Sequence, residues 1–150
     1  MKSIAIASDH GGFRLKERLK AYLKRRGFKI KDLGAYSAQR CDYPQFAYLL
    51  AKDIAAGKPP RGILICKSGI GNSIVANRVP GVRAALCCNQ KAARLSREHN
   101  DSNVLVLGAS FVSRDLAVKI LKAWLAARFL GGRHKRRLSQ IKKIEKQVCR

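Results

Sequence analysis

The chain has 150 residues, 47% of them hydrophobic and 27% charged, which is ordinary for a folded water-soluble protein. No apolar run approaches the ~20 residues of a membrane span and the apolar start is too short for a signal peptide, so we expect one cytoplasmic domain over residues 1–150. The formal net charge of +23 invites a nucleic-acid partner, but no RNA-binding signature or zinc-finger spacing accompanies it, which favours a solvated basic surface with incidental nucleic-acid affinity.

Short β-like runs alternate with helix-like segments along the whole chain. Strands are predicted at residues 3–7, 28–33, 62–66, 82–87 and 103–107. Most of them are continuous apolar runs, as expected for strands that are buried on both faces of a sheet, and residues 28–33 are the more polar exception.

Apolar residues recur at helical spacing between these strands. The three clearest groups are Leu15, Leu19, Tyr22 and Leu23; Phe46, Leu49, Leu50 and Ile54; and Leu116, Ile120, Trp124 and Ala127. Asp42 followed by Pro44 resembles a helix start, and Gly27, Gly57 and the Gly131-Gly132 pair lie where helices should stop.

The alternation predicts a three-layer α/β/α fold with a five-stranded parallel sheet of order 2-1-3-4-5 and a C-terminal helix. In that order strands one and three are neighbours, and ligands of such folds bind beyond their carboxyl ends. The residues that follow these two strands include Asp9, His10 and Cys66. We therefore expect these three side chains to share one crevice.

Cys66 ends a strand and precedes the glycine loop Lys67-Ser68-Gly69-Ile70-Gly71, after which a helix is expected. Unpaired amides at a helix start favour anions, so they would make a thiolate accessible, hold a phosphate or stabilise an oxyanion. The alternative is a buried cysteine whose glycines serve only the turn. The five cysteines are an odd number without paired metal spacing, and we expect no disulfides.

His99, near the end of a predicted helix, could act as a general acid or base, or it could be an ordinary surface histidine. Asn100 and Asp101 could be turn formers. Arg133 and Arg137 are four residues apart and would share a helix face suited to a phosphate, although a solvated basic helix would have the same pattern.

Five segments together resemble the type B ribose-5-phosphate isomerases, whose wider family includes galactose-6-phosphate and allose-6-phosphate isomerases. They are "SDHGGFRLK", "CDYP", "ILICKSGIGNSIVANR", "REHNDSNVL" and "GGRHKRRLSQI", and the likeness runs from Ile4 to about Ile144. The resemblance implies a Rossmann-like fold and a homodimer or dimer of dimers. It also implies that His99, Asn100, Arg133 and Arg137 reach the active site of the partner subunit.

The implied reaction interconverts ribose 5-phosphate and ribulose 5-phosphate through a cis-enediolate, without metal or cofactor. By matching position, Cys66 corresponds to the base that moves a proton between C2 and C1. His99 corresponds to the acid that opens the furanose ring, with Asp9 and Ser68 assisting. The implied substrate contacts are the amides of Gly69, Ile70 and Gly71 for the enediolate, His10, Arg133 and Arg137 for the phosphate, Asn100 for hydroxyls, and Tyr43 at the pocket wall.

Two positions depart from the family pattern. Lys67 follows the cysteine where the family usually has glycine, and Ser110 stands where many members have arginine. Lys67 therefore either replaces a phosphate contact, narrows the pocket against longer sugars, or points to solvent. The alternatives to a ribose-5-phosphate isomerase are a six-carbon aldose-6-phosphate isomerase acting on allose or galactose 6-phosphate, and a Rossmann-like nucleic-acid-binding protein.

Overall fold

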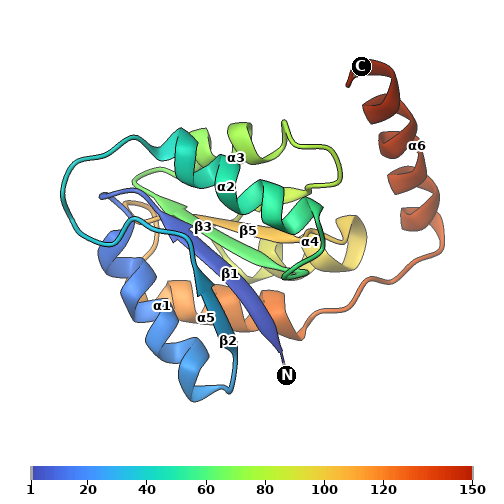
Figure 1. The fold of residues 1–150 in the computed structure, drawn as a ribbon. Helices are drawn as coiled ribbons and strands as arrows, with labels where there is room; N and C mark the ends of the chain where they lie inside the picture. The colour runs from blue at the N-terminus through green and yellow to red at the C-terminus, as the bar shows by residue number, and fades with distance from the viewer. Residues whose placement is uncertain (1, 150) are drawn as a thin grey trace.

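The predicted alternation is present throughout residues 2–149, the part of the chain that the computed structural model describes (Figure 1). The strands are β1 (Ser3–Ser8), β2 (Lys29–Asp32), β3 (Gly62–Cys66), β4 (Ala84–Leu86) and β5 (Val104–Gly108). The helices are α1 (Phe13–Arg25), α2 (Tyr43–Ala55), α3 (Ile70–Ala76), α4 (Gln90–Asn100), α5 (Arg114–Ala126) and α6 (Arg133–Val148). None of these helices is long and apolar enough to cross a bilayer.

The five strands form one parallel sheet of order β2-β1-β3-β5-β4. The predicted order 2-1-3-4-5 is therefore wrong for the last two strands. All five residues of β5 are buried, whereas the three residues of β4 are only partly buried. An inner strand of a covered parallel sheet must be apolar on both faces, so β5 takes the inner place and the short β4 forms the edge.

The strand predicted at residues 82–87 is shorter than expected because its first two amides are engaged elsewhere. The Val82 amide donates to the Val79 carbonyl at 3.1 Å, which closes a turn. The Arg83 amide donates to the Asn103 side chain at 2.7 Å. Regular pairing with β5 therefore begins at Ala84.

Helices cover both faces of the sheet, so the three-layer prediction is confirmed (Figure 1). Leu19, Ile120 and Trp124 belong to the core on one face, where α1, α4 and α5 pack. Leu50 and Ile54 belong to the core on the other face, beneath α2 and α3. Leu49, predicted to share the buried stripe of α2, is instead 48% exposed, and α5 ends before Ala127.

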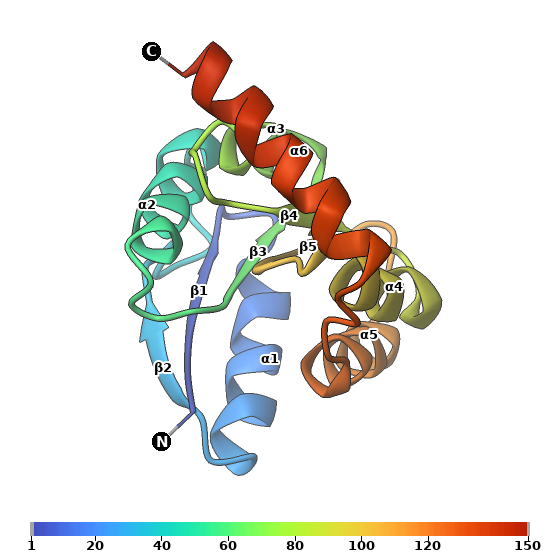
Figure 2. The ribbon, with the colours of Figure 1, turned by 90° about the vertical axis from the view of Figure 1, so that its right-hand side faces the viewer.

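Glycines shape the ends of the helices largely as predicted. Gly27 and Gly57 adopt φ values of 77° and 74° just after α1 and α2. Gly131 and Gly132, with φ of 68° and 55°, lie immediately before α6 rather than directly after α5. An extended connection leads from α5 to α6, which lies at one side of the molecule in Figure 1 and crosses in front of α3 in Figure 2.

Candidate active site

The loops after β1 and β3 lie side by side because these strands are parallel neighbours, with Ser8 opposite Ile65. Two glycines in the first loop permit the close approach. A Cβ on Gly12 would lie 2.4 Å from the Ile65 carbonyl oxygen, and one on Gly11 would lie 3.2 Å from the Cβ of Lys67. The carboxyl edge of the sheet therefore brings both loops to one place, as predicted.

A cavity of about 480 Å³ opens at this edge. Its walls come from the two loops, the start of α2 and the first turns of α3. The lining residues are Asp9, Tyr43, Cys66, Lys67, Ser68, Ile70, Gly71 and Ile74. Seven of these eight are residues that the family resemblance, or the departure from it at Lys67, associates with the site, and Ile74 is the addition. The volume is within the range of small-ligand sites.

The Cys66 side chain is 4% exposed at the end of β3, and its sulfur faces the loop that follows. The Gly69 amide donates a hydrogen bond to Sγ at 3.1 Å. Gly69 has φ of 78°, and a Cβ there would lie 2.5 Å from Leu86 Cδ1, so only glycine fits. The sulfur is thus held against a backbone donor at the wall of the cavity.

The other amides of the loop are not equivalent. The Ile70 amide donates to the Ser68 hydroxyl at 3.2 Å, so it is already engaged, like that of Gly69. The amides of Gly71 and Asn72 have no acceptor among residues 2–149. Of the three amides expected to contact substrate, those of Gly69 and Ile70 are engaged within the loop and only that of Gly71 is free among the described residues. The free donors are therefore Gly71 and Asn72, in the first turn of α3, where helix amides have no partner within the helix.

Tyr43 and Asp9 fix the two sides of the cavity. A Cβ on Gly71 would lie 2.4 Å from Tyr43 Cζ, so the tyrosine ring packs directly on the first turn of α3. The buried Asp9 carboxylate accepts a hydrogen bond from the Gly12 amide at 3.0 Å. The crevice expected for three side chains therefore contains Asp9 and Cys66, whereas His10 is not among its lining residues. The Nδ1 atom of His10 lies 3.0 Å from the Cys41 carbonyl oxygen and 3.2 Å from the Cys41 amide nitrogen.

The remaining predicted residues lie away from this cavity within the single chain. The His99 ring on α4 stacks on His134 of α6, with centroids 4.2 Å apart and planes 9° apart. Burial lowers the pKa of His134, and the charges of His99, Arg133 and Arg137 act in the same direction. Both arginines are exposed on α6, and Asn100 lines a second hollow, of about 400 Å³, between α6 and the β4 edge.

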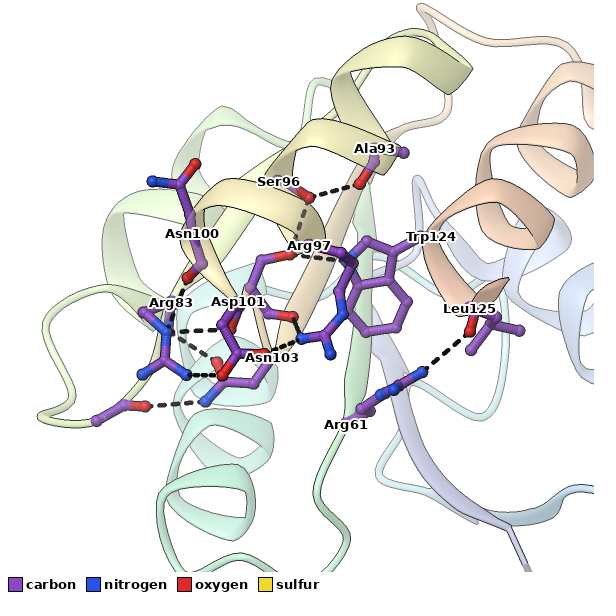
Figure 3. Close-up of polar contacts among 12 residues, drawn as sticks. Arg61, Arg83, Ala93, Ser96, Arg97, Asn100, Asp101, Asn103, Trp124 and Leu125 are labelled. Carbon is purple, nitrogen blue, oxygen red and sulfur yellow. Dashed lines mark hydrogen bonds and ion pairs between the residues drawn. The ribbon is translucent and has the colours of Figure 1, made fainter. Parts of the chain in front are cut away.

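A partly buried polar network holds the turn after α4 in place (Figure 3). Asp101 ends α4 with φ of 45° and accepts hydrogen bonds from Arg97 at 2.7 Å and Arg83 at 3.1 Å. Trp124 Nε1 donates to Ser102 Oγ at 2.8 Å. Asp101 is therefore a turn former, as the sequence suggested, and its partners fix the backbone that presents His99.

Sequence reasoning missed Lys16, which is fully buried. Its ammonium donates to Asp32 at 2.7 Å and to the Ala35 carbonyl at 2.6 Å, anchoring the loop that leads to Tyr43. One signal was present: Lys16 lies three residues before Leu19 and seven before Leu23, on the apolar face of α1.

Comparison with known proteins gives a consistent result. The sequence profile of the ribose/galactose isomerase family matches residues 4–141. Ribose-5-phosphate isomerase B of Escherichia coli (strain K12) is 46% identical over 147 residues, 98% of this chain and 99% of that protein.

Two solved structures share the fold across nearly the whole chain. Ribose-5-phosphate isomerase B of Clostridium thermocellum has a TM-score of 0.95 and 48% identity, covering 97% of this chain and 98% of that one. The enzyme from Mycoplasma genitalium, with bound ribulose-5-phosphate, has a TM-score of 0.93 and 42% identity, covering 97% of each chain.

Proposed function

The chain belongs to the ribose/galactose isomerase family, and we propose that it interconverts ribose 5-phosphate and ribulose 5-phosphate. The observation that carries the proposal is the contact between Cys66 Sγ and the Gly69 amide at the wall of the cavity. A thiolate at this position can take a proton from C2 of the open-chain sugar and return it to C1, while the proton of the O2 hydroxyl passes to O1. The same base thus serves both directions of the reaction.

The proton transfer leaves negative charge on the oxygens of an enediolate. In our proposal the amides of Gly71 and Asn72 donate to these oxygens, since neither has an acceptor among the described residues. The Gly69 and Ile70 amides keep the sulfur and the Ser68 hydroxyl in place. Asp9 and Ser68 orient substrate hydroxyls, and Tyr43 closes the wall beside Gly71.

We propose that the site is completed by a second copy of the chain. His99, Asn100, Arg133 and Arg137 are absent from the lining of the Cys66 cavity, although the family resemblance assigns them to it. A homodimer in which α4 and α6 of one copy reach the cavity of the other would supply the ring-opening acid and the phosphate cations. His10 would meet the same phosphate from within the chain. A dimer of dimers would preserve this arrangement.

Lys67 would determine how the site holds its substrate. It lines the cavity and makes no ion pair among residues 2–149, so its ammonium is available to an anion. The Ser110 amide donates to the Lys67 carbonyl at 2.9 Å, so the two positions that depart from the family pattern are adjacent. We propose that the lysine cation substitutes for the arginine missing at Ser110.

A metal-free assay with ribose 5-phosphate, allose 6-phosphate and galactose 6-phosphate tests the reaction and its substrate. We expect turnover of the pentose phosphate that Cys66→Ala abolishes, with Cys88→Ala as the exposed-thiol control. Faster turnover of allose 6-phosphate or galactose 6-phosphate would show that the protein is a six-carbon aldose-6-phosphate isomerase instead. Absence of turnover with all three sugars would contradict the proposal. We expect the reaction in the cytoplasm, where thiols stay reduced.

Alkylation tests the role of the sulfur directly. Trypsin cleavage after Arg61 and Lys67 releases residues 62–67, a peptide that contains Cys66 and no other cysteine. Saturating ribose 5-phosphate should slow the labelling of this peptide and leave that of Cys149 unchanged. Equal labelling of residues 62–67 with and without substrate would contradict the assignment of Cys66 as the base.

A further inference from the structure

The positive charge of the chain is largely unneutralised, and the proposed reaction does not use most of it. Six of the 32 Lys and Arg side chains form ion pairs among residues 2–149: Lys16, Lys20, Lys31, Arg83, Arg94 and Arg97. Helix α6 is the extreme case. Its basic residues are Arg133, Lys135, Arg136, Arg137, Lys142, Lys143 and Lys146, all exposed and none with a carboxylate within ion-pair distance in the described chain.

The single acidic residue of α6 does not compensate these charges, because it is directed toward the body of the protein. Glu145 accepts a hydrogen bond from the Gly81 amide at 2.9 Å. Together with Leu138 and Ile141 it lines the hollow beside the β4 edge. Within the single chain, one side of α6 therefore faces the body of the protein and the other sides are exposed.

Helical geometry divides the cations of α6 into separate rows. At about 100° per residue, Lys135, Lys142 and Lys146 lie within about 20° of a common direction and extend over about 16 Å. Arg133 and Arg137 lie roughly opposite, about 180° around the helix. The arginine row, which the proposed function assigns to the sugar phosphate of a second copy, is thus distinct from the lysine row.

We propose that the lysine row of α6, defined as Lys135, Lys142 and Lys146, binds the phosphodiester backbone of nucleic acid. The three exposed ammonium groups lie in one line along the helix, about 10 Å and 6 Å apart, and their binding to phosphates would release condensed counterions. Phosphate contacts carry no sequence information, so the binding is independent of sequence. Helix α6 contains no Phe, Tyr or Trp that could add stacking on bases.

An anionic membrane is the less suitable partner. A helix that lies in a lipid interface inserts a wide apolar face. Two of the apolar residues of α6, Leu138 and Ile141, instead line the hollow against the body of the protein. The lysine row is offset by roughly 90° from them, so it can meet a surface phosphate without requiring that apolar side to leave the protein.

The test compares two charge-matched triple variants. Lys135→Gln/Lys142→Gln/Lys146→Gln removes the lysine row, and Arg18→Gln/Lys24→Gln/Arg25→Gln removes three exposed, unpaired cations of α1. Binding of a fluorescein-labelled 20-nucleotide RNA is followed by anisotropy across a salt series. The slope of log K against log salt is negative, and we expect the α6 variant to reduce its magnitude by about 2, at about 0.7 per lost phosphate contact. The α1 variant should leave the slope nearly unchanged.

Duplex DNA and vesicles with anionic lipid serve as further arms, and sugar-phosphate isomerisation reports on folding. We expect duplex DNA to bind through the same lysine row. If the proposed function holds, both variants should keep wild-type isomerase activity. Circular dichroism measures their folding independently of that activity. An equal change of the salt slope in both variants would show that binding depends on the total charge of the protein and not on the lysine row. That result, absence of RNA binding by the wild type, or lysine-dependent binding to vesicles alone would overturn the proposal.

Discussion

Gly11 and Lys67 face each other across the rim of the cavity, on the loops that follow β1 and β3. A Cβ on Gly11 would lie 3.2 Å from Lys67 Cβ and 3.4 Å from the Lys67 amide nitrogen. The glycine therefore leaves room for the lysine side chain where the two loops meet. In the proposed function this lysine would meet the phosphate of the substrate.

Removing Lys67 should weaken substrate binding more than it slows turnover. We expect Lys67→Gly to raise KM for ribose 5-phosphate about 10-fold or more, because hydrogen bonds to charged groups contribute about 1.5–3 kcal/mol. Lys67→Met keeps the length and removes the charge, so it separates electrostatics from pocket shape. An unchanged KM together with unchanged six-carbon activity would assign Lys67 to solvent.

The same coupling predicts a non-additive pair. Gly11→Ala should impair the wild type, since the new methyl group would crowd Lys67, and should be better tolerated with Lys67→Gly. A double-mutant cycle on kcat/KM measures the coupling. Additive effects of the two substitutions on kcat/KM would indicate that the two loops move apart without a loss of activity.

Gly69→Ala should abolish most activity by displacing the amide that contacts Cys66. A methyl group there would lie 2.5 Å from Leu86 Cδ1 and 3.1 Å from the Leu107 carbonyl carbon. We expect kcat to fall about 10²–10³-fold, as for loss of one preorganised donor. Gly27→Ala is the matched control, because Gly27 has φ of 77° but no atom within 4 Å of its added Cβ. Equal losses would mean that backbone strain alone is responsible.

If the site is shared between copies, two inactive variants should complement one another. Mixing Cys66→Ala with His99→Asn after mild unfolding and refolding would form heterodimers with one intact site of the two. Random association of equal amounts predicts about a quarter of the wild-type activity. Failure of the refolded mixture to regain activity, while refolded wild type does, would contradict the shared site.

His99 should matter most for the ring form of the substrate. If it donates the proton that opens the furanose, His99→Asn should reduce turnover of cyclic sugar phosphate more than that of an open-chain analogue. Parallel assays with the two substrates measure the difference. Equal losses on both would remove the ring-opening role.

Lys16 should control stability in acid. Burial raises the pKa of Asp32, but hydrogen bonds from Lys16 and Lys20 outweigh it and hold the pKa of this carboxyl below its ordinary value of 3.8. The unfolded chain therefore takes up this proton first. The stability that the carboxylate contributes is present above about pH 4 and is lost as pH falls through the folded pKa.

We expect Lys16→Met to lower the free energy of unfolding at pH 7 by about 1.5–3 kcal/mol, since a buried charged donor is lost from Asp32 and from the Ala35 carbonyl. The difference from wild type should narrow below pH 4. Urea unfolding at pH 7 and pH 3.5 measures the free-energy difference and its decrease in acid. Lys20→Met serves as the comparison, because the Lys20 side chain also contacts Asp32 but is partly exposed. A pH-independent difference would attribute the effect of Lys16 to packing.

The sequence by itself determined the local features of this protein. Helical and strand periodicity, and glycines at Gly27 and Gly57, follow from interactions within a few residues, so most elements were predictable. The position of Cys66 between a buried strand and a glycine loop was predictable for the same reason. The adjacency of Asp9 and Cys66 needed only the right-handed, parallel rule for connecting strands.

Only the tertiary structure decided which distant segments meet. The order of β4 and β5 depends on how many residues each strand can bury. The predicted strand at residues 82–87 was too long, so it suggested more buried residues in β4 than the structure has. The burial of Lys16 depends on Asp32, and the stack of His99 on His134 depends on the return of α6. Such contacts join residues with no fixed spacing in the chain, so their energies exist only once the elements are packed together.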